Sequence, residues 1–159
     1  MPPEEVRTLD PAVADLALPD QSGTVRRLAD FRGRNVVLYF YPMDTTPGCT
    51  TEGKEFREFH DQFAAFDCAV VGVSTDSVQS HRAFAEQHGF PFILLSDSKG
   101  ELAGALGVLR NGVAARSTFV IDRDLRIRRV FHDVAPRGHA QKVLNFVRSI
   151  VESHRMLGG

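Results

Sequence analysis

The feature that most constrains the fold is a set of short, continuous apolar runs separated by helical patterns. The runs are NVVLYFYP (35–42), CAVVGVSTD (68–76) and PFILLSD (91–97). They are rich in β-branched and aromatic residues and do not alternate with polar ones, which is typical of strands buried on both faces. Amphipathic helical patterns lie between them, at 50–66 and 76–90. Strands that alternate with helices predict parallel crossover units.

The two ends of the chain add antiparallel structure and a last helix. Residues 14–34 have alternating apolar positions around an Asp-Gln-Ser-Gly turn, which predicts a small N-terminal hairpin. Residues 116–122 and 126–133 flank a short polar turn as an antiparallel pair, and 139–153 form a closing helix. The expected fold is α/β, a three-layer sandwich with a mixed central sheet. No linker divides the chain, so we expect a single domain over residues 1–159.

Charge and cysteine usage exclude several classes of protein. The net charge of −1 gives no global field for nucleic acid or an anionic membrane, so we expect neither partner. The longest apolar run is too short to span a bilayer, and MPPEEVRTLD has no signal-peptide pattern. With two cysteines and no export signal, a secreted disulfide scaffold is not expected. We therefore expect a cytoplasmic location, where thiols stay reduced.

One of the two cysteines lies where a helix is expected to begin. With Thr46 as N-cap and Pro47 at the first helical position, Cys49 falls in the first turn. There it faces free backbone N–H groups and the positive end of the helix dipole, which favour thiolate over thiol. Sites in α/β sheets gather at the carboxyl ends of parallel strands, and Cys49 follows such an end. The position therefore predicts a nucleophile.

A carboxylate and a distant arginine complete the candidate site. Cys49 and Glu52 fall on one stripe of the helix with four phenylalanines, so both are expected at the mouth of a buried face. A carboxylate beside a thiolate is unfavourable unless a cation lies between them. Arg116, at the start of a predicted strand, is the candidate, because its planar fork can reach both groups.

The active-site stretch also carries a recognisable motif. Pro42, Thr46 and Cys49 match the Pro-x-x-x-Thr-x-x-Cys pattern of the peroxiredoxins. The block YFYPMDTTPGCTTE (39–52), with GVSTDS (72–77) downstream, most resembles the bacterioferritin comigratory protein or peroxiredoxin Q subfamily. The resemblance extends over nearly the whole chain and implies a thioredoxin-like fold. It also implies a thiol-dependent peroxidase that needs no cofactor and no metal.

The resemblance assigns roles to each site residue. Cys49 is the expected peroxidatic cysteine, which reduces hydrogen peroxide or alkyl hydroperoxides and becomes a sulfenic acid. The Thr46 hydroxyl, the Cys49 backbone N–H and Arg116 are expected to hold the peroxide oxygens, and Pro42 to shield the thiolate. Glu52 either orients Arg116 or is an ordinary acid of the first helical turn. The Thr46 hydroxyl can serve as a cap or bind substrate, and the two uses compete.

The chain departs from the subfamily at the resolving cysteine. Many members carry it five residues after the peroxidatic one, where this chain has Lys54, and others carry it on the next helix, which here has none. Cys68 is expected to be a buried structural thiol, the alternative being a resolving role that requires local unfolding. The favoured mechanism is therefore one-Cys. An external thiol, such as thioredoxin, glutaredoxin or a low-molecular-weight thiol, is the expected reductant, and the expected state is a monomer or weak homodimer.

Other functions have less support from the residues. Six histidines invite a metal site, but His81 and His88, and His132 and His139, are each seven residues apart, so surface positions are expected instead. A disulfide oxidoreductase needs Cys-x-x-Cys, whereas positions 46 and 52 hold Thr and Glu. A redox sensor or holdase that oxidises Cys49 without efficient turnover stays open as the alternative.

Overall fold

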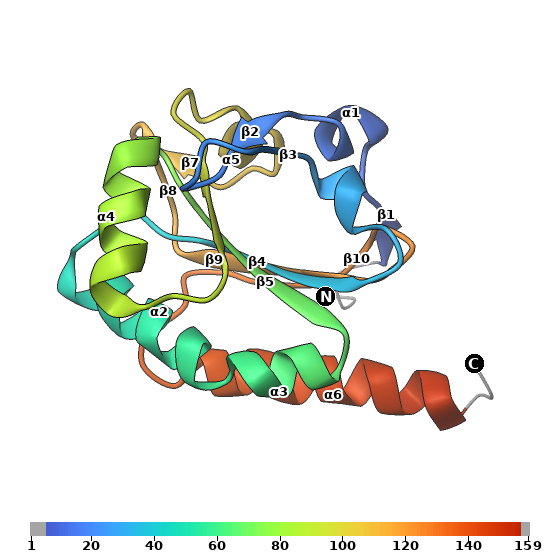
Figure 1. Cartoon of the computed structure of the whole chain (residues 1–159). Helices are drawn as coiled ribbons and strands as arrows, with labels where there is room; N and C mark the ends of the chain where they lie inside the picture. The colour runs from blue at the N-terminus through green and yellow to red at the C-terminus, as the bar shows by residue number, and fades with distance from the viewer. Residues whose placement is uncertain (1–5, 157–159) are drawn as a thin grey trace.

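A six-stranded mixed sheet forms the centre of the computed structural model, which describes residues 6–156 (Figure 1). Three neighbouring strands run parallel and the remaining pairs are antiparallel, as the sequence predicts for a mixed sheet. The strand order is β1 (Arg7–Thr8), β10 (Arg126–Phe131), β9 (Ser117–Ile121), β4 (Asn35–Phe40), β5 (Cys68–Ser74) and β6 (Ile93–Ser96).

The central strand β4 divides the core into two halves. Its side chains alternate between the faces, so Val37 and Tyr39 join one apolar cluster while Leu38 and Phe40 join the other. The first cluster is covered by α2 (Pro47–Glu58), α3 (His60–Ala65), α4 (Val78–His88) and α6 (His139–Met156). Figure 1 shows α2, α3 and α6 below the sheet, and this arrangement confirms the expected three layers.

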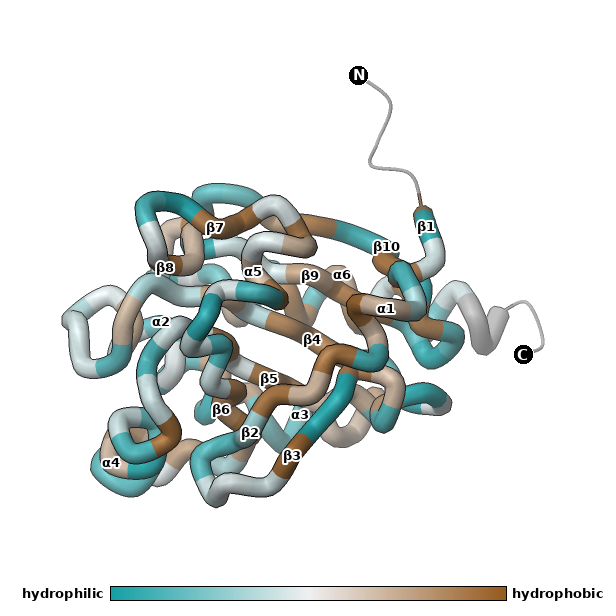
Figure 2. The backbone as a smooth tube through the Cα atoms, turned by 90° about the horizontal axis from the view of Figure 1, so that it is seen from above, coloured by the Kyte–Doolittle hydropathy of each residue, from teal (hydrophilic) through white to brown (hydrophobic). Residues whose placement is uncertain are grey.

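The opposite face is covered by short elements. They are α1 (Pro11–Ala14), the 3₁₀ helix η1 (Leu28–Phe31), the hairpin β2 (Leu18–Pro19) with β3 (Val25–Arg26), α5 (Glu101–Ala105), and the hairpin β7 (Leu109–Arg110) with β8 (Val113–Ala114). Figure 2, seen from above, shows these segments laid across the strands of the sheet. The β2–β3 pair confirms the expected N-terminal hairpin. The other short elements were not expected, because pieces of two to five residues carry no readable periodicity.

The hairpin also covers an edge of the sheet. The Gln21 side-chain amide donates to the Phe92 carbonyl oxygen at 3.0 Å, and its oxygen accepts from the Leu94 N–H at 2.9 Å. Gln21 thus satisfies backbone groups beside β6, an edge strand that would otherwise present them to another chain.

The helix expected over 50–66 is two helices. Phe59 is both the C-cap of α2 and the N-cap of α3, with φ −94° and ψ 4°. The apolar stripe nevertheless continues across the break, because Phe56 and Phe63 are both fully buried. Since hydrophobic spacing is kept through the bend, periodicity alone gives no sign of it.

Part of the stretch that lacks a signal-peptide pattern, residues 1–5, lies outside the described residues. Among the helices within 6–156, none combines the length and apolarity needed to cross a membrane.

Gly53 allows α2 to pack closely on the aromatic core. A Cβ at this position would lie 2.5 Å from Phe90 Cζ, and Phe90 is held by aromatic contacts with Phe84 and Phe92. We expect Gly53→Ala to lower the free energy of unfolding by about 1–3 kcal/mol, because overpacking outweighs the gain of about 1 kcal/mol in helix propensity. Denaturant unfolding measures the change.

Gly104 in α5 is the matched control, since a Cβ there meets nothing closer than Leu109 Cδ2 at 3.8 Å. Gly104→Ala is expected to be neutral or stabilising by up to about 1 kcal/mol. If both alanines changed stability alike, close packing at Gly53 would not be what excludes a side chain.

Candidate active site

The site is built where β4 ends and α2 begins. Thr46 is the N-cap of α2, with φ −68° and ψ 151°, and Pro47 occupies the first helical position, as predicted. The Thr46 hydroxyl makes no capping bond and instead donates to the Met43 carbonyl oxygen at 3.1 Å. The oxygen of that hydroxyl therefore keeps lone pairs that can accept a hydrogen bond from a ligand. Cys49 lies in the first turn and is only 2% exposed.

Arg116 bridges the two groups that the sequence placed on one stripe. Its Nη1 donates to Glu52 Oε1 at 2.6 Å, and its Nη2 lies 3.4 Å from the Cys49 sulfur. Arg116 directly precedes β9, which pairs with β4, so the sheet brings it to the start of α2. The structure therefore brings Cys49, Glu52 and Arg116 together in the geometry that the sequence predicts. Their catalytic roles stay predictions.

A glycine makes room for this bridge. A Cβ at Gly48 would lie 3.1 Å from Arg116 Nη2 and 3.2 Å from Pro136 Cγ. The guanidinium therefore lies directly over the first turn of α2. A larger residue at position 48 would displace it or Pro136.

Burial dominates the electrostatics of Glu52. The carboxyl is fully buried, and burial raises its pKa to about 7 even though Arg116 acts in the opposite direction. Its second oxygen, Oε2, has no hydrogen-bond partner among the residues that the structure describes. Burial by itself lowers the pKa of Arg116, but the nearby Glu52 and Cys49 raise it overall, so the guanidinium keeps its charge.

The prediction that the histidines are surface residues is wrong for His81 and His139. His139, at the start of α6, is 3% exposed and shares a 2.7 Å hydrogen bond with the Thr118 hydroxyl. Burial, with smaller effects of Lys142 and Arg116, lowers the pKa of His139 to about 4. A neutral imidazole therefore packs against the edge of the site, with its ring T-shaped to Phe56.

His81, on α4, is completely buried and belongs to a polar cluster that sequence reasoning missed. Asp44, Asp76 and His81 offer atoms within 4.8 Å of one another, as a metal site would. Asp44 and Asp76 already accept hydrogen bonds from neighbouring hydroxyls and a backbone N–H, which accounts for the cluster. The available signal was the position of Asp44 and Asp76, each just after a buried parallel strand.

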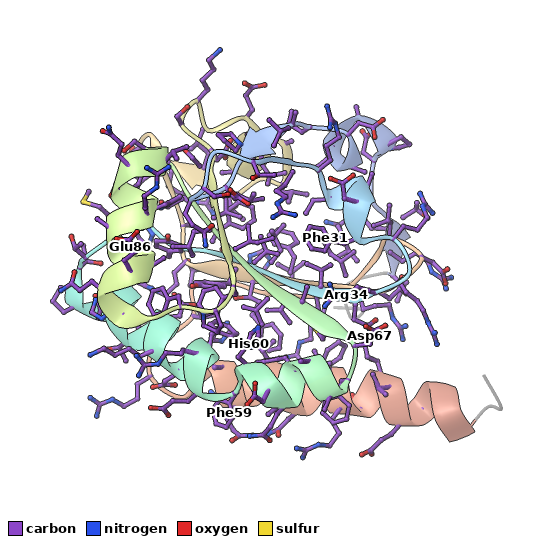
Figure 3. The ribbon with its side chains drawn as sticks, viewed as in Figure 1. Phe31, Arg34, Phe59, His60, Asp67 and Glu86 are labelled. Atoms are coloured by element: carbon purple, nitrogen blue, oxygen red, sulfur yellow. The ribbon has the colours of Figure 1, made fainter. Side chains whose placement is uncertain are left out.

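Cys68 lies at the other end of the sheet. It pairs with Asn35 at the start of β4, and β4 then runs five rises of about 3.3 Å, roughly 16 Å, before the active-site loop begins. A disulfide requires Cα atoms within about 7 Å. Figure 3 shows Asp67, the preceding residue, beside Arg34 at the end of the sheet away from α4. Cys68 is buried, as expected, and burial raises the pKa of its thiol to about 12.

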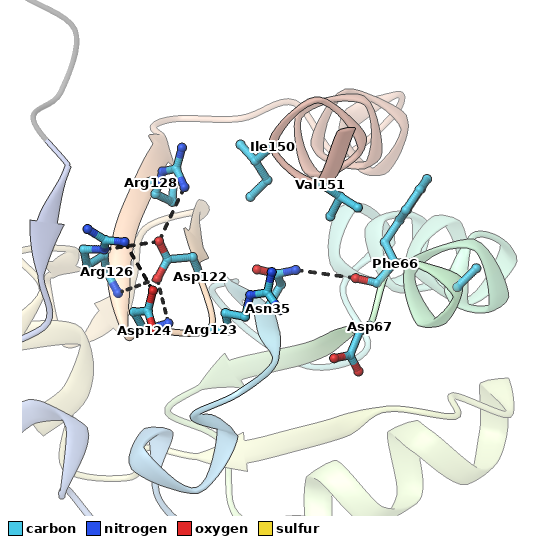
Figure 4. A pocket seen from close by; sticks show the side chains of 11 residues that line it. Asn35, Phe66, Asp67, Asp122, Arg123, Asp124, Arg126, Arg128, Ile150 and Val151 are labelled. Atoms are coloured by element: carbon cyan, nitrogen blue, oxygen red, sulfur yellow. Dashed lines mark hydrogen bonds and ion pairs between the residues drawn. The ribbon is translucent and has the colours of Figure 1, made fainter. Parts of the chain in front are cut away.

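The pocket in Figure 4 belongs to that distant end. It has a volume of about 390 Å³ and lies between the β9–β10 turn and α6. Its arginines face carboxylates, since Arg126 and Arg128 both lie within 3.5 Å of Asp122. Arg126 and Arg128, which follow the β9–β10 turn, are thus held in ion pairs away from Cys49.

Two further residues complete the comparison with the sequence. Pro42 follows Tyr41 in the loop before α2 and is half-buried, and its shielding of the sulfur stays a prediction. Lys54, at the position where a resolving cysteine was expected, is exposed on α2.

Comparison with known proteins is consistent with this geometry. Residues 10–130 match the model of the AhpC/TSA family. The chain belongs to that family. It is 39% identical over 147 residues to peroxiredoxin Bcp of Bacillus subtilis, covering 87% of this chain and 93% of that protein. It is 37% identical to a chloroplastic peroxiredoxin Q of Sedum lineare, covering 84% of this chain and 74% of that protein.

Solved structures of the same subfamily share the fold. A mutant of Xylella fastidiosa PrxQ aligns with a TM-score of 0.88 at 38% identity, covering 91% of this chain and 96% of that one. The bacterioferritin comigratory protein of Xanthomonas campestris, described with an alkyl peroxide reduction activity, aligns at 0.88 and 34% identity, covering 92% and 99%. These relatives confirm the expected subfamily, the thioredoxin-like fold and the class of thiol peroxidase.

The raised pKa of Glu52 predicts a pH-dependent stability. Between about 4.5 and 7 the folded protein binds more protons than the unfolded chain, so stability falls as pH rises through this window. We expect a loss on the order of 3 kcal/mol, since one pKa unit corresponds to about 1.4 kcal/mol. Denaturant unfolding at pH 5 and pH 8 measures it, and Glu52→Gln is expected to flatten the dependence.

Glu58→Gln is the control, because Glu58 lies on the same helix but is exposed. It is expected to keep the wild-type dependence on pH. If the free energy of unfolding fell as steeply with pH in Glu52→Gln as in the wild type, a group other than Glu52 would be responsible.

Proposed function

We propose that the protein reduces hydrogen peroxide and alkyl hydroperoxides with Cys49 as the peroxidatic residue. The observation that carries this proposal is the Arg116 fork, which contacts the Cys49 sulfur and the buried Glu52 at once. The thiolate attacks one peroxide oxygen and the O–O bond breaks. The sulfur becomes a sulfenic acid, and the leaving oxygen takes a proton to give water or an alcohol. The alkyl peroxide activity described for the Xanthomonas relative supports the second substrate class.

The surrounding residues act by holding the peroxide. Arg116 donates to the oxygen on which negative charge develops, and the backbone N–H of Cys49 donates beside it. The Thr46 oxygen, whose hydrogen is already directed to Met43, accepts from the peroxide O–H. Glu52 fixes the guanidinium, and its burial supports that role over the role of an ordinary first-turn acid. Pro42 shields the sulfur from water.

We propose a one-Cys cycle for regeneration. Cys68 lies at the opposite end of the sheet, and Lys54 occupies the usual position of a resolving cysteine. An external thiol therefore condenses with the sulfenic acid, releasing water and leaving a mixed disulfide. A second thiol then restores Cys49 and leaves with the first as a disulfide. Thioredoxin, glutaredoxin or a low-molecular-weight thiol can serve as donor.

Two free, separated thiols also suit a reducing compartment, so we propose a cytoplasmic location. The proposed state is a monomer or weak homodimer.

Turnover with cysteine variants tests this function. With excess hydrogen peroxide and each thiol donor in turn, Cys49→Ser is expected to abolish peroxide consumption. Cys68→Ala is expected to retain the wild-type rate within about twofold, because Cys68 lies roughly 16 Å from the loop. Peptide mapping after one equivalent of peroxide is expected to find Cys49 sulfenic or joined to the donor.

Three other outcomes would contradict parts of the proposed function. Turnover by Cys49→Ser would exclude this sulfur as the nucleophile, and a Cys49–Cys68 peptide would overturn the one-Cys cycle. Stoichiometric oxidation without turnover in every donor would favour the sensor or holdase function.

The Arg116 fork predicts an unusually sensitive substitution. Arg116→Lys keeps the positive charge, but one ammonium cannot span both Glu52 and the sulfur. We expect the second-order rate of peroxide attack to fall about 100-fold, the typical effect of losing one oriented donor. Stopped-flow measurement under single-turnover conditions gives the rate.

Arg110→Lys is a suitable control, because Arg110 is an exposed residue of β7. It is expected to react like the wild type. If Arg116→Lys did the same, the guanidinium geometry would have no part in the reaction.

A further inference from the structure

The loop that carries Thr46 is anchored by one buried carboxylate, that of Asp44. Asp44 is 2% exposed and lies two residues before Thr46. Its Oδ1 accepts from the Tyr41 hydroxyl at 2.7 Å, and its Oδ2 accepts from the Ser80 hydroxyl at 2.7 Å. His81 Nδ1 lies 2.7 Å from the same Oδ2. The loop is therefore tied through one side chain to the first turn of α4.

Both ring nitrogens of His81 make short hydrogen bonds. Its Nε2 lies 2.8 Å from the Leu95 carbonyl oxygen, which can only accept, so Nε2 carries a hydrogen. Its Nδ1 faces a carboxylate oxygen, which also accepts. The short Nδ1–Oδ2 contact requires one hydrogen between the two atoms. In the ion-pair form that hydrogen lies on Nδ1, so that both ring nitrogens of His81 carry hydrogen.

This pair has few charged neighbours. Asp76, two residues after β5, is the other ionisable group close by, and its Oδ2 accepts from the Asp44 backbone N–H at 2.8 Å. Tyr41 contributes its hydroxyl and an aromatic ring 6.3 Å from the imidazole. Since both residues are buried and hydrogen-bonded to each other, removal of either side chain leaves a buried polar group of the other without its partner.

The conformation that this pair holds is unusual. Thr45, between Asp44 and Thr46, has φ 66°, a left-handed conformation that β-branched residues rarely adopt. Such strain persists only where the surroundings fix both sides of it. Asp44 is fixed on one side by α4 and by Asp76, and Thr46 on the other by its bond to Met43 and by the start of α2.

We propose that Asp44 and His81 form a positioning pair that holds the peroxide-binding loop, and with it the Thr46 hydroxyl, in the reactive conformation. The proposal rests on the proposed function, because it takes Thr46 as a group that binds peroxide. Among the described residues, no hydrogen bond or ion pair joins Asp44 or His81 to Cys49. Their effect reaches the reaction through the backbone of residues 44–46.

The first test measures the protonation of His81 directly and does not depend on peroxidase activity. In ¹⁵N-labelled protein at pH 7, the resonances of His81 are expected to show hydrogen on both ring nitrogens. In Asp44→Asn the amide can donate to Nδ1, so His81 is expected to become neutral with hydrogen only on Nε2. A wild-type His81 with one bare nitrogen would overturn the ion pair.

The second test distinguishes an effect on the peroxide-binding loop from an effect on the general reactivity of the Cys49 sulfur. Asp44→Ala is expected to slow the second-order peroxide reaction at least tenfold, while the rate of Cys49 alkylation by iodoacetamide stays within about twofold. Asp44→Asn, whose amide can keep the bonds to Tyr41, Ser80 and His81, is expected to recover most of the lost rate. Circular dichroism checks that each variant is folded.

The outcomes distinguish the two proposals. An unchanged peroxide rate in Asp44→Ala, or a parallel fall in alkylation, would overturn positioning of the loop. Failure of Asp44→Asn to recover rate would do the same. A wild-type protein that consumed no peroxide would remove the proposed function, while the nitrogen resonances would still decide the ion pair.

Discussion

The Arg116 guanidinium lies between a buried carboxyl and a buried thiol, and it joins the two elements on which the site depends. Arg116 directly precedes β9, whereas Glu52 and Cys49 lie in the first turns of α2. A buried Glu52 without its cation would be a costly group, since burial already raises its pKa to about 7. The same cation that makes this carboxyl tolerable is the one directed at the sulfur. The stability of this site and the proposed reactivity of Cys49 therefore depend on one interaction.

The sheet explains why that interaction can form. Arg116 is 64 residues from Glu52 in sequence, and they meet because β9 pairs antiparallel with β4, so β9 begins where β4 ends. β4 then leads through a strained loop into α2. Thr45 adopts its left-handed conformation within this loop. The central strand thus sets both the position of Cys49, the proposed nucleophile, and the direction from which the Arg116 guanidinium approaches it.

Much of this arrangement follows from the sequence, for identifiable reasons. Buried strands read as continuous apolar runs, and Thr46-Pro47 signals a helix start, so the place of Cys49 could be predicted. Arg116 was found because a thiolate beside a carboxylate needs a cation. His81 was missed, because its partner Asp44 is 37 residues away and spacing does not reveal burial. The break at Phe59 was missed as well, since the apolar stripe runs through it unchanged.

The separation of the two thiols has a consequence for how the oxidised protein can be detected. Cys49 and Cys68 lie at opposite ends of the sheet, so in the proposed one-Cys cycle oxidation closes no covalent ring within the chain. Without such a ring, the unfolded ensemble is not restricted, and oxidation brings no entropic stabilisation. Apart from the mixed disulfide with a protein thiol donor, oxidised and reduced chains then migrate alike in nonreducing electrophoresis. The sulfur's state has to be followed by mass or by a chemical probe.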